Sequence, residues 1–175
     1  LVVMGNDGKV GRDLPSPMPG AQCSPVRWWT STAILANCTT QLWEVPVDGG
    51  ASTPLTAVNP GNESDPGFGK DLGDADAWQL PSGTFLQSMG ACGSMFLSRL
   101  TPDMHTTEVT VPGVDSSVRV TGATADKLVL QAKLDCGSGV SLLTYDPAAN
   151  TTTALLGPPV NGGGVTDALL YPSPR

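Results

Sequence analysis

The sequence predicts an all-β domain built from one repeated four-stranded unit, and two observations lead to this prediction. First, short apolar runs alternate with turn-forming residues, and the 175-residue chain contains 21 Gly and 16 Pro. These two residue types fall mainly between the apolar runs, which favours many short strands joined by turns over helices or disorder. Second, an internal repeat occurs three times between residues 26 and 156.

The N-terminal segment predicts a β-hairpin. Residues 1–4 and 9–14 are strand-like runs on either side of Asn6-Asp7-Gly8. Asp-Gly between two such runs is a strong local signal for a tight turn. We expect this hairpin to supply the outer two strands of a unit that precedes the first complete copy of the repeat.

Each complete copy contains four short strands, with a turn signal before the fourth. The first copy predicts strands at 26–29, 33–38, 41–47 and 52–55. The second copy predicts strands at 76–80, 84–88, 95–100 and 107–111. The third copy predicts strands at 117–121, 127–132, 140–145 and 152–156. The turn signals are Asp48-Gly49-Gly50, Thr101-Pro102-Asp103 and Asp146-Pro147-Ala148.

The four cysteines support the register of the repeat. Cys38 ends the second strand of copy one, Cys92 and Cys136 lie just after the second strands of the other two copies, and Cys23 precedes the first strand of copy one. An antiparallel hairpin would bring Cys23 beside Cys38, and Cys92 and Cys136 occupy equivalent positions in adjacent copies. We therefore predict disulfides Cys23–Cys38 and Cys92–Cys136. No CxxC pair or zinc-ligand spacing is present, which favours an oxidising compartment.

Repeated four-stranded units of about 40 to 50 residues are the building blocks of β-propellers, in which each sheet buries its faces against neighbouring blades. The sequence therefore predicts a β-propeller-like array of about four four-stranded blades, and the chain length favours one domain over residues 1–175. Residues 167–171 predict another first strand. The termini would then combine into one closing blade, or a larger propeller has been cut. The alternative fold is a two-sheet β-sandwich, which also uses many short strands.

Two groups of segments resemble known propeller proteins. Leu42-Trp43-Glu44-Val45-Pro46-Val47-Asp48-Gly49-Gly50 with Thr53-Pro54-Leu55-Thr56 resembles the outer hairpin of TolB-type blades. The segments Trp28-Trp29, Gly90-Ala91-Cys92-Gly93 and Ser141-Leu142-Leu143 resemble exported propeller proteins of actinobacteria. The chain as a whole is similar to TolB-like or WD40-like repeat proteins. This resemblance implies an extracytoplasmic scaffold that binds other proteins through its loop faces, and it transfers no functional residue.

Charge and hydropathy disfavour two kinds of partner. The net charge is −7, and the nine Lys and Arg residues are scattered singly, so nucleic-acid binding is disfavoured. No stretch approaches the roughly 20 apolar residues of a membrane-spanning helix, and we expect no transmembrane segment. Because the chain begins at Leu1 within a strand-like run, we expect a mature or trimmed chain from which a signal peptide could have been removed.

The sequence predicts no catalytic residues. His105 is the only histidine; it lies in a predicted turn, where we expect it to be exposed, and no Gly-x-Ser-x-Gly nucleophile motif accompanies it. The carboxylates fall mostly in turns or outer strands and do not form the rigid pair of a glycosidase. The tryptophans are interpreted as core and inter-blade packing, in preference to a sugar-binding platform: Trp28, Trp29, Trp43 and Trp78.

The longest polar insertion, residues 58–75, brings together carboxylates that could hold calcium. The candidate ligands are Asp65, Asp71, Asp74 and Asp76. Their spacing matches no EF-hand, so solvated carboxylates are the preferred interpretation. We predict no cofactor.

These features favour a non-catalytic, extracytoplasmic β-propeller module that binds a protein or another ligand. Its partner would be another protein or a component of the cell envelope, and its localisation secreted or cell-envelope associated. The alternative is the propeller portion of a larger exported hydrolase. The sequence does not identify the ligand-binding residues.

Overall fold

The structure is a computed structural model, which describes residues 1–58, 73–90, 93–115, 117–132 and 139–157. The described residues form fourteen strands and no α-helix. The strands make one two-stranded sheet and three four-stranded sheets. Within each sheet, neighbouring strands follow one another in chain order and are antiparallel. The all-β prediction and its four-stranded units are thereby confirmed.

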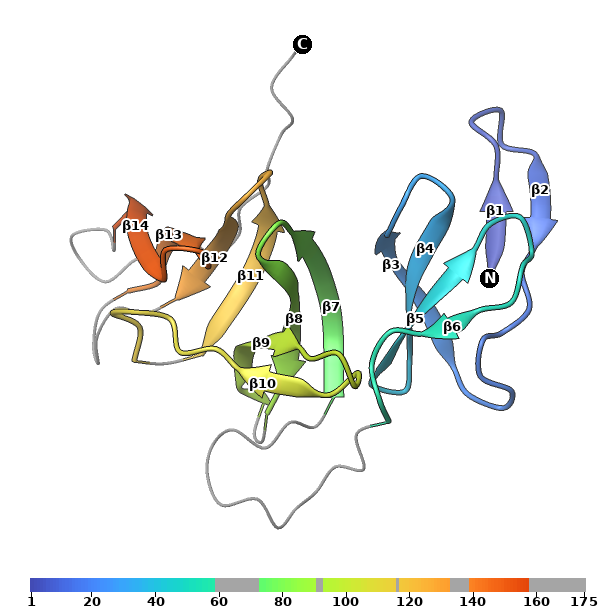
Figure 1. Ribbon diagram of the computed structural model, residues 1–175. Coiled ribbons are helices and arrows are strands. Elements are labelled where there is room, and N and C mark those ends of the chain that lie inside the picture. Colours follow the sequence, from blue (N-terminus) through green and yellow to red (C-terminus); the bar gives the residue numbers. More distant parts are fainter. Residues whose placement is uncertain (59–72, 91–92, 116, 133–138, 158–175) are drawn as a thin grey trace.

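The N-terminal hairpin and sheet 1 come first in the chain (Figure 1). The hairpin consists of β1 (Val2–Met4) and β2 (Val10–Asp13). Sheet 1 consists of β3 (Cys23–Trp28), β4 (Ala33–Cys38), β5 (Gln41–Pro46) and β6 (Thr53–Pro54). The predicted hairpin is therefore present, and β4 has the predicted bounds because a run of apolar residues between two turns specifies it locally.

Sheets 2 and 3 repeat the same arrangement. Sheet 2 consists of β7 (Gly73–Leu80), β8 (Gly83–Met89), β9 (Met95–Leu100) and β10 (Thr106–Glu108). Sheet 3 consists of β11 (Val118–Ala123), β12 (Leu128–Ala132), β13 (Ser141–Asp146) and β14 (Thr151–Leu156). Every strand of the three predicted copies is therefore present. The further strand predicted at 167–171 lies outside the described residues.

Consecutive sheets pack face to face and share a hydrophobic cluster at each junction. Leu14 of the hairpin packs with Ala36 and Val45 of sheet 1. Leu35 and Leu42 of sheet 1 pack with Ala77 and Leu86 of sheet 2. A larger cluster joins sheets 2 and 3: Trp78, Leu80, Phe85, Leu97, Val111, Val118, Val120, Leu128, Leu130, Ala132, Leu143 and Tyr145.

Strand alternation explains how one sheet serves two junctions. Successive side chains of a strand point to opposite faces. Leu35 accordingly packs toward sheet 2 while Ala36 packs toward the hairpin. In sheet 2, Leu86 packs toward sheet 1, whereas Phe85 packs toward sheet 3. Burial of both faces of sheet 2 gives each central strand apolar residues at adjacent positions, which are the short apolar runs of the sequence.

The hairpin buries only one of its faces in the described part of the chain. Val3 packs against sheet 1. Val2, Met4 and Val10 belong to the opposite face, where they are 57%, 58% and 66% exposed. Figure 1 shows the hairpin at one end of the array and sheet 3 at the other.

Two fourth strands are shorter than the sequence predicts. In sheet 1, Leu42 N donates to Thr56 Oγ1 at 3.1 Å, and Gln41 Nε2 donates to Thr56 O at 2.7 Å. These side-chain bonds accompany a backbone bond from Leu55 N to Leu42 O at 2.8 Å, so the segment stays attached to β5 after β6 ends. In sheet 2, β10 ends at Glu108, and Val111 turns inward to join the core, where it is 4% exposed.

Candidate functional site

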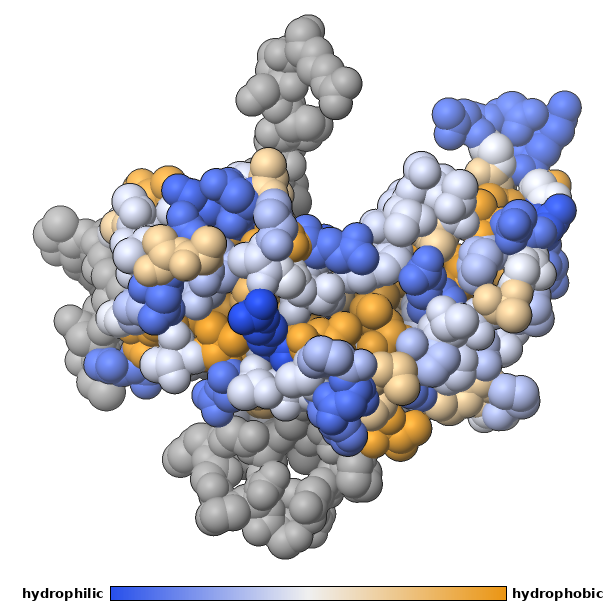
Figure 2. All heavy atoms as spheres, in the orientation of Figure 1, coloured by the Kyte–Doolittle hydropathy of each residue, from blue (hydrophilic) through white to orange (hydrophobic). Residues whose placement is uncertain are grey.

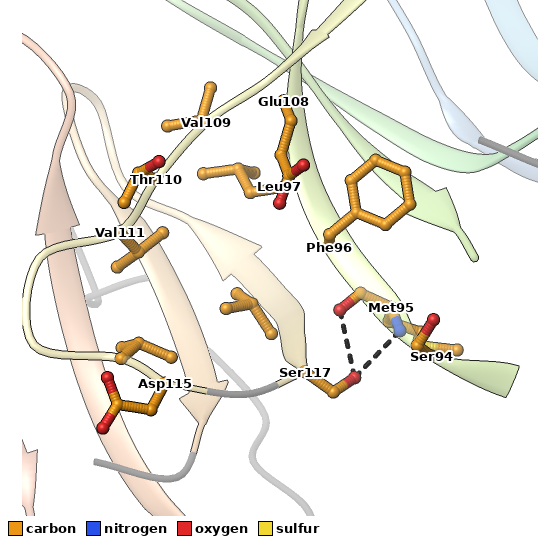
Figure 3. A pocket seen from close by; sticks show the side chains of 12 residues that line it. Ser94, Met95, Phe96, Leu97, Glu108, Val109, Thr110, Val111, Asp115 and Ser117 are labelled. Carbon is orange, nitrogen blue, oxygen red and sulfur yellow. Dashed lines mark hydrogen bonds between the residues drawn. The ribbon is translucent and has the colours of Figure 1, made fainter. Parts of the chain in front are cut away.

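A hollow of about 600 Å³ lies beside the outer edge of β9. It is bordered by β9 and by the connection that leaves β10 and leads to β11 (Figure 3). We call it the β9 hollow and define it by its lining residues: Ser94, Met95, Phe96, Leu97, Glu108, Val109, Thr110, Val111, Val114, Asp115, Ser117 and Val118. The volume is in the range of sites that bind small molecules, about 300–1,000 Å³.

A tight turn draws the connection away from β9 and opens the hollow. Val114 N donates to Val111 O at 3.2 Å, and Gly113 has φ +73°. Pro at the second position and Gly with positive φ at the third are the signature of a type II turn. Thr152 Oγ1 donates to Pro112 O at 3.0 Å and so fastens the turn to sheet 3.

Ser117 closes the other end of the hollow. Its hydroxyl accepts a hydrogen bond from Met95 N at 2.8 Å and donates one to Met95 O at 3.0 Å, as Figure 3 shows. The Ser117 side chain thus forms the two hydrogen bonds to Met95 that the backbone of a neighbouring strand would otherwise form. Since Val109 N donates to Leu97 O at 2.8 Å, the connection contacts β9 at both ends and leaves it in between.

The hollow has an apolar floor and an acidic mouth. Leu97, Val111 and Val118 belong to the core between sheets 2 and 3 and are buried. Glu108 is exposed and pairs with Ser98, so strand alternation puts it on the same face of sheet 2 as Phe96. Because Ser98 also pairs with Leu86, this face points toward sheet 1, opposite to Leu97, and Glu108 and Phe96 line the hollow at its rim, beside the edge of β9. The lining contains two carboxylates and no Lys, Arg or His.

The sequence does not predict this site. Glu108 falls in an outer strand, a position that argues against a catalytic role and carries no signal for ligand binding. The Pro112-Gly113 pair directly after a predicted strand is the one signal near the site, because it requires the chain to turn there. The hollow itself depends on the position of this turn, and the contact between the turn and sheet 3 fixes that position.

The structure describes two of the four calcium candidates. Asp74 is 3% exposed, and Ser88 Oγ donates to its Oδ1 at 2.8 Å. Asp76 forms an ion pair with Arg27. Asp65 and Asp71 lie outside the described residues. Among the residues that the structure describes, no group of three or more His, Cys, Asp or Glu side chains could hold a metal ion.

Arg27 and Asp76 connect sheets 1 and 2 through two hydrogen bonds. Arg27 Nε donates to Asp76 Oδ1 at 2.7 Å, and Nη2 donates to Oδ2. The guanidinium also stacks on the Trp78 ring, 4.5 Å from its centroid. Burial raises the pKa of Asp76, and the hydrogen bonds and charge of Arg27 offset only part of this effect. The pair therefore holds the two sheets in register at an electrostatic cost.

This raised pKa predicts a measurable pH dependence. Because the folded protein holds the Asp76 proton more tightly than the unfolded chain, Asp76 contributes stability that is fully present below its unfolded pKa and is lost as pH rises through the folded value. Urea unfolding from pH 3 to 7 should show wild type losing stability relative to Asp76→Asn as the pH rises.

Asp103→Asn is the control, because its comparison with wild type should show the opposite dependence of stability on pH. The Thr101 hydroxyl donates to Asp103 Oδ1 at 2.5 Å and lowers the pKa of that carboxyl. Wild type should therefore lose stability relative to Asp103→Asn as the pH falls. The same sign in both comparisons would contradict the role assigned to Asp76.

Asp74 belongs to a second cluster of hydrogen-bonded polar residues between sheets 1 and 2. Ser88 Oγ lies 2.6 Å from Ser98 Oγ, and both serines are fully buried. Asn37 Nδ2 of sheet 1 donates to Asp74 O at 2.6 Å. This arrangement cross-links β7, β8 and β9 and ties them to sheet 1. Its burial from solvent suits a structural role.

The tryptophans and His105 differ in their surroundings. Trp78 is 5% exposed and Trp29 packs against the cluster between sheets 1 and 2. Trp43 packs in the cluster beside the hairpin. Trp28, in contrast, is 61% exposed, so the expectation of core packing is wrong for this residue, which ends β3 at the sheet edge. His105 is exposed in the β9–β10 turn, as predicted.

A disulfide joins Cys23 and Cys38, which face each other across β3 and β4. This is the first of the two pairs that the sequence predicts. Cys92 and Cys136 lie outside the described residues, so their pairing stays a prediction. Within the described ranges, no helix has the length and apolar character needed to cross a membrane.

Comparisons with known proteins add no relative: no family model matches the chain, and neither a curated protein nor a solved structure matches it. The protein is therefore characterised by the architecture of its described residues. It is an all-β protein of consecutive four-stranded antiparallel sheets with a hollow beside the second sheet.

Proposed function

We propose that this chain is a non-catalytic, β-propeller-like binding module that acts outside the cytoplasm and takes its ligand in the β9 hollow. The hollow is the observation that carries the proposal. Its floor is formed by buried side chains of the core between sheets 2 and 3, and its walls by β9 and by the β10–β11 connection with its anchored turn. A preformed apolar cavity of this size with a few polar groups at its mouth is the usual form of a ligand site.

Two further observations support the architecture and compartment in this proposal. Three four-stranded sheets follow one another and bury apolar residues at each junction, which is how propeller blades are stabilised. The Cys23–Cys38 disulfide fits an oxidising compartment, where such bonds persist.

Titration with Nile red, a neutral apolar dye whose fluorescence rises in apolar surroundings, tests the proposal. We expect saturable, single-site binding to wild type. Thr110→Trp places an indole at an exposed lining position and should weaken dye binding by at least about tenfold, because the new side chain occupies the hollow.

Thr107→Trp is the matched control. Thr107 is an exposed residue of β10 that does not line the hollow, so its replacement should leave the dye affinity within about twofold. Equal affinities for Thr110→Trp and wild type would show that the dye binds elsewhere, and absent binding to wild type would count against the proposed function.

A further inference from the structure

We infer that the β9 hollow selects small amphiphilic cations, in which an apolar body fills the cavity and an ammonium group lies at its mouth. This inference rests on the proposed function, because it names the class of ligand that the same hollow takes. It is argued from three features of the lining: an apolar floor, a carboxylate beside an aromatic ring, and the absence of basic side chains.

The floor accounts for the apolar part of the ligand. Val111 and Val118 are 4% and 6% exposed and lie in the core cluster, with partly buried Val109 and Val114 packed beside them. None of these four side chains can form a hydrogen bond. An alkyl or aromatic body that enters the hollow therefore loses contact with water without leaving a polar protein group unpaired.

Glu108 and Phe96 account for the cationic part. Both residues line the hollow and lie on the same face of sheet 2, since Glu108 pairs with Ser98 and Phe96 is two residues from Ser98 along β9. This face points toward sheet 1, opposite to the apolar floor, so the two side chains meet the hollow at its rim, beside the edge of β9. Diagonal neighbours at this separation are within reach of aromatic and long side chains. A carboxylate beside a ring attracts an ammonium through its charge and through the ring face.

Figure 3 distinguishes the two carboxylates of the lining. The Glu108 carboxylate lies toward Phe96 and Leu97, whereas the Asp115 carboxylate points away from the cavity. Glu108 therefore carries the selectivity, and Asp115 adds only a more distant charge. An anionic ligand would meet two carboxylates with no basic lining residue, in a chain of net charge −7.

Displacement of Nile red by three compounds with the same eight-carbon tail tests this inference: octylammonium, octanol and octanoate. We expect octylammonium to displace the dye most effectively and octanoate least. In Glu108→Gln, the affinity for octylammonium should fall by about tenfold, while the affinity for octanol should change by less than about twofold. Raising the ionic strength should reduce the preference for octylammonium in wild type.

Asp115→Asn is the matched control, because it removes one negative charge from the same lining while leaving Glu108 in place; the preference for octylammonium should persist. Thermal unfolding of both variants checks that they are folded. If octanol and octanoate displace the dye as well as octylammonium does, the charge selection is wrong while the proposed function stands. If wild type binds no dye, the proposed function itself fails.

Discussion

Replacing Gly73 with alanine should lower the free energy of unfolding by about 3–5 kcal/mol, combining backbone strain with overpacking. Gly73 has φ +125°, a conformation that essentially only glycine adopts. A Cβ at this position would lie 2.1 Å from Thr40 Cβ and 2.8 Å from Thr40 O. The backbone oxygen cannot rotate away, so sheet 1 or β7 must move. Urea unfolding of the two proteins at neutral pH measures the difference.

Gly113→Ala separates the two contributions. Gly113 also has positive φ, at +73°, but no atom lies within 4 Å of the position of an added Cβ. Its replacement should therefore cost only about 1 kcal/mol, from the backbone alone. The double variant Gly73→Ala/Thr40→Gly should recover part of the lost stability, since it removes the closest contact. Equal losses for Gly73→Ala and Gly113→Ala would contradict the proposed clash.

The Gly73–Thr40 contact has this effect because it lies where sheets 1 and 2 are joined. Asp74 N donates to Thr40 O at 2.9 Å, and Thr40 N donates to Asn37 Oδ1 at 3.1 Å. Asn37 in turn donates to Asp74 O. The β4–β5 turn of one sheet is thus bonded to the first strand of the next, and displacement of Gly73 would strain every bond in this group.

The strands could be predicted from the sequence because their signals are local. β4 and β9 have the predicted bounds, Ala33–Cys38 and Met95–Leu100, since each is an apolar run between turn residues. β7 begins at Gly73, three residues before its predicted start. Gly73 and Asp74 carry no apolar strand signal, and their pairing with Met89 and Ser88 of β8 makes them part of the strand.

The candidate site could not be predicted to the same extent, because it depends on contacts between sheets. The sequence indicates the turn at Pro112-Gly113 but not that Thr152 of sheet 3 anchors it. It likewise gives no sign that Arg27 pairs with Asp76, which is 49 residues away. Such pairings follow from the way consecutive sheets are stacked, and neither hydrophobic periodicity nor turn residues report on that stacking.

Loss of the Cys23–Cys38 disulfide should lower the free energy of unfolding by about 3 kcal/mol, the effect of opening a loop of about 15 residues in the unfolded chain. The two cysteines are 15 residues apart and form the first pair of the β3–β4 register. The cross-link restricts the unfolded ensemble, while β3 and β4 keep their hydrogen bonds without it. Cys23→Ala/Cys38→Ala should therefore fold to the same sheets with a lower midpoint in urea.

Reduction of the wild-type protein provides the control that separates the cross-link from the packing of the sulfur atoms. Cys38 is fully buried, so alanine also removes core contacts that a reduced thiol retains. Reduced wild type should accordingly lie between oxidised wild type and Cys23→Ala/Cys38→Ala, closer to the double variant. If reductant leaves the urea midpoint unchanged while the double variant is destabilised, the contribution comes from packing. The case for an oxidising compartment then loses its energetic basis, because the fold would be equally stable with free thiols.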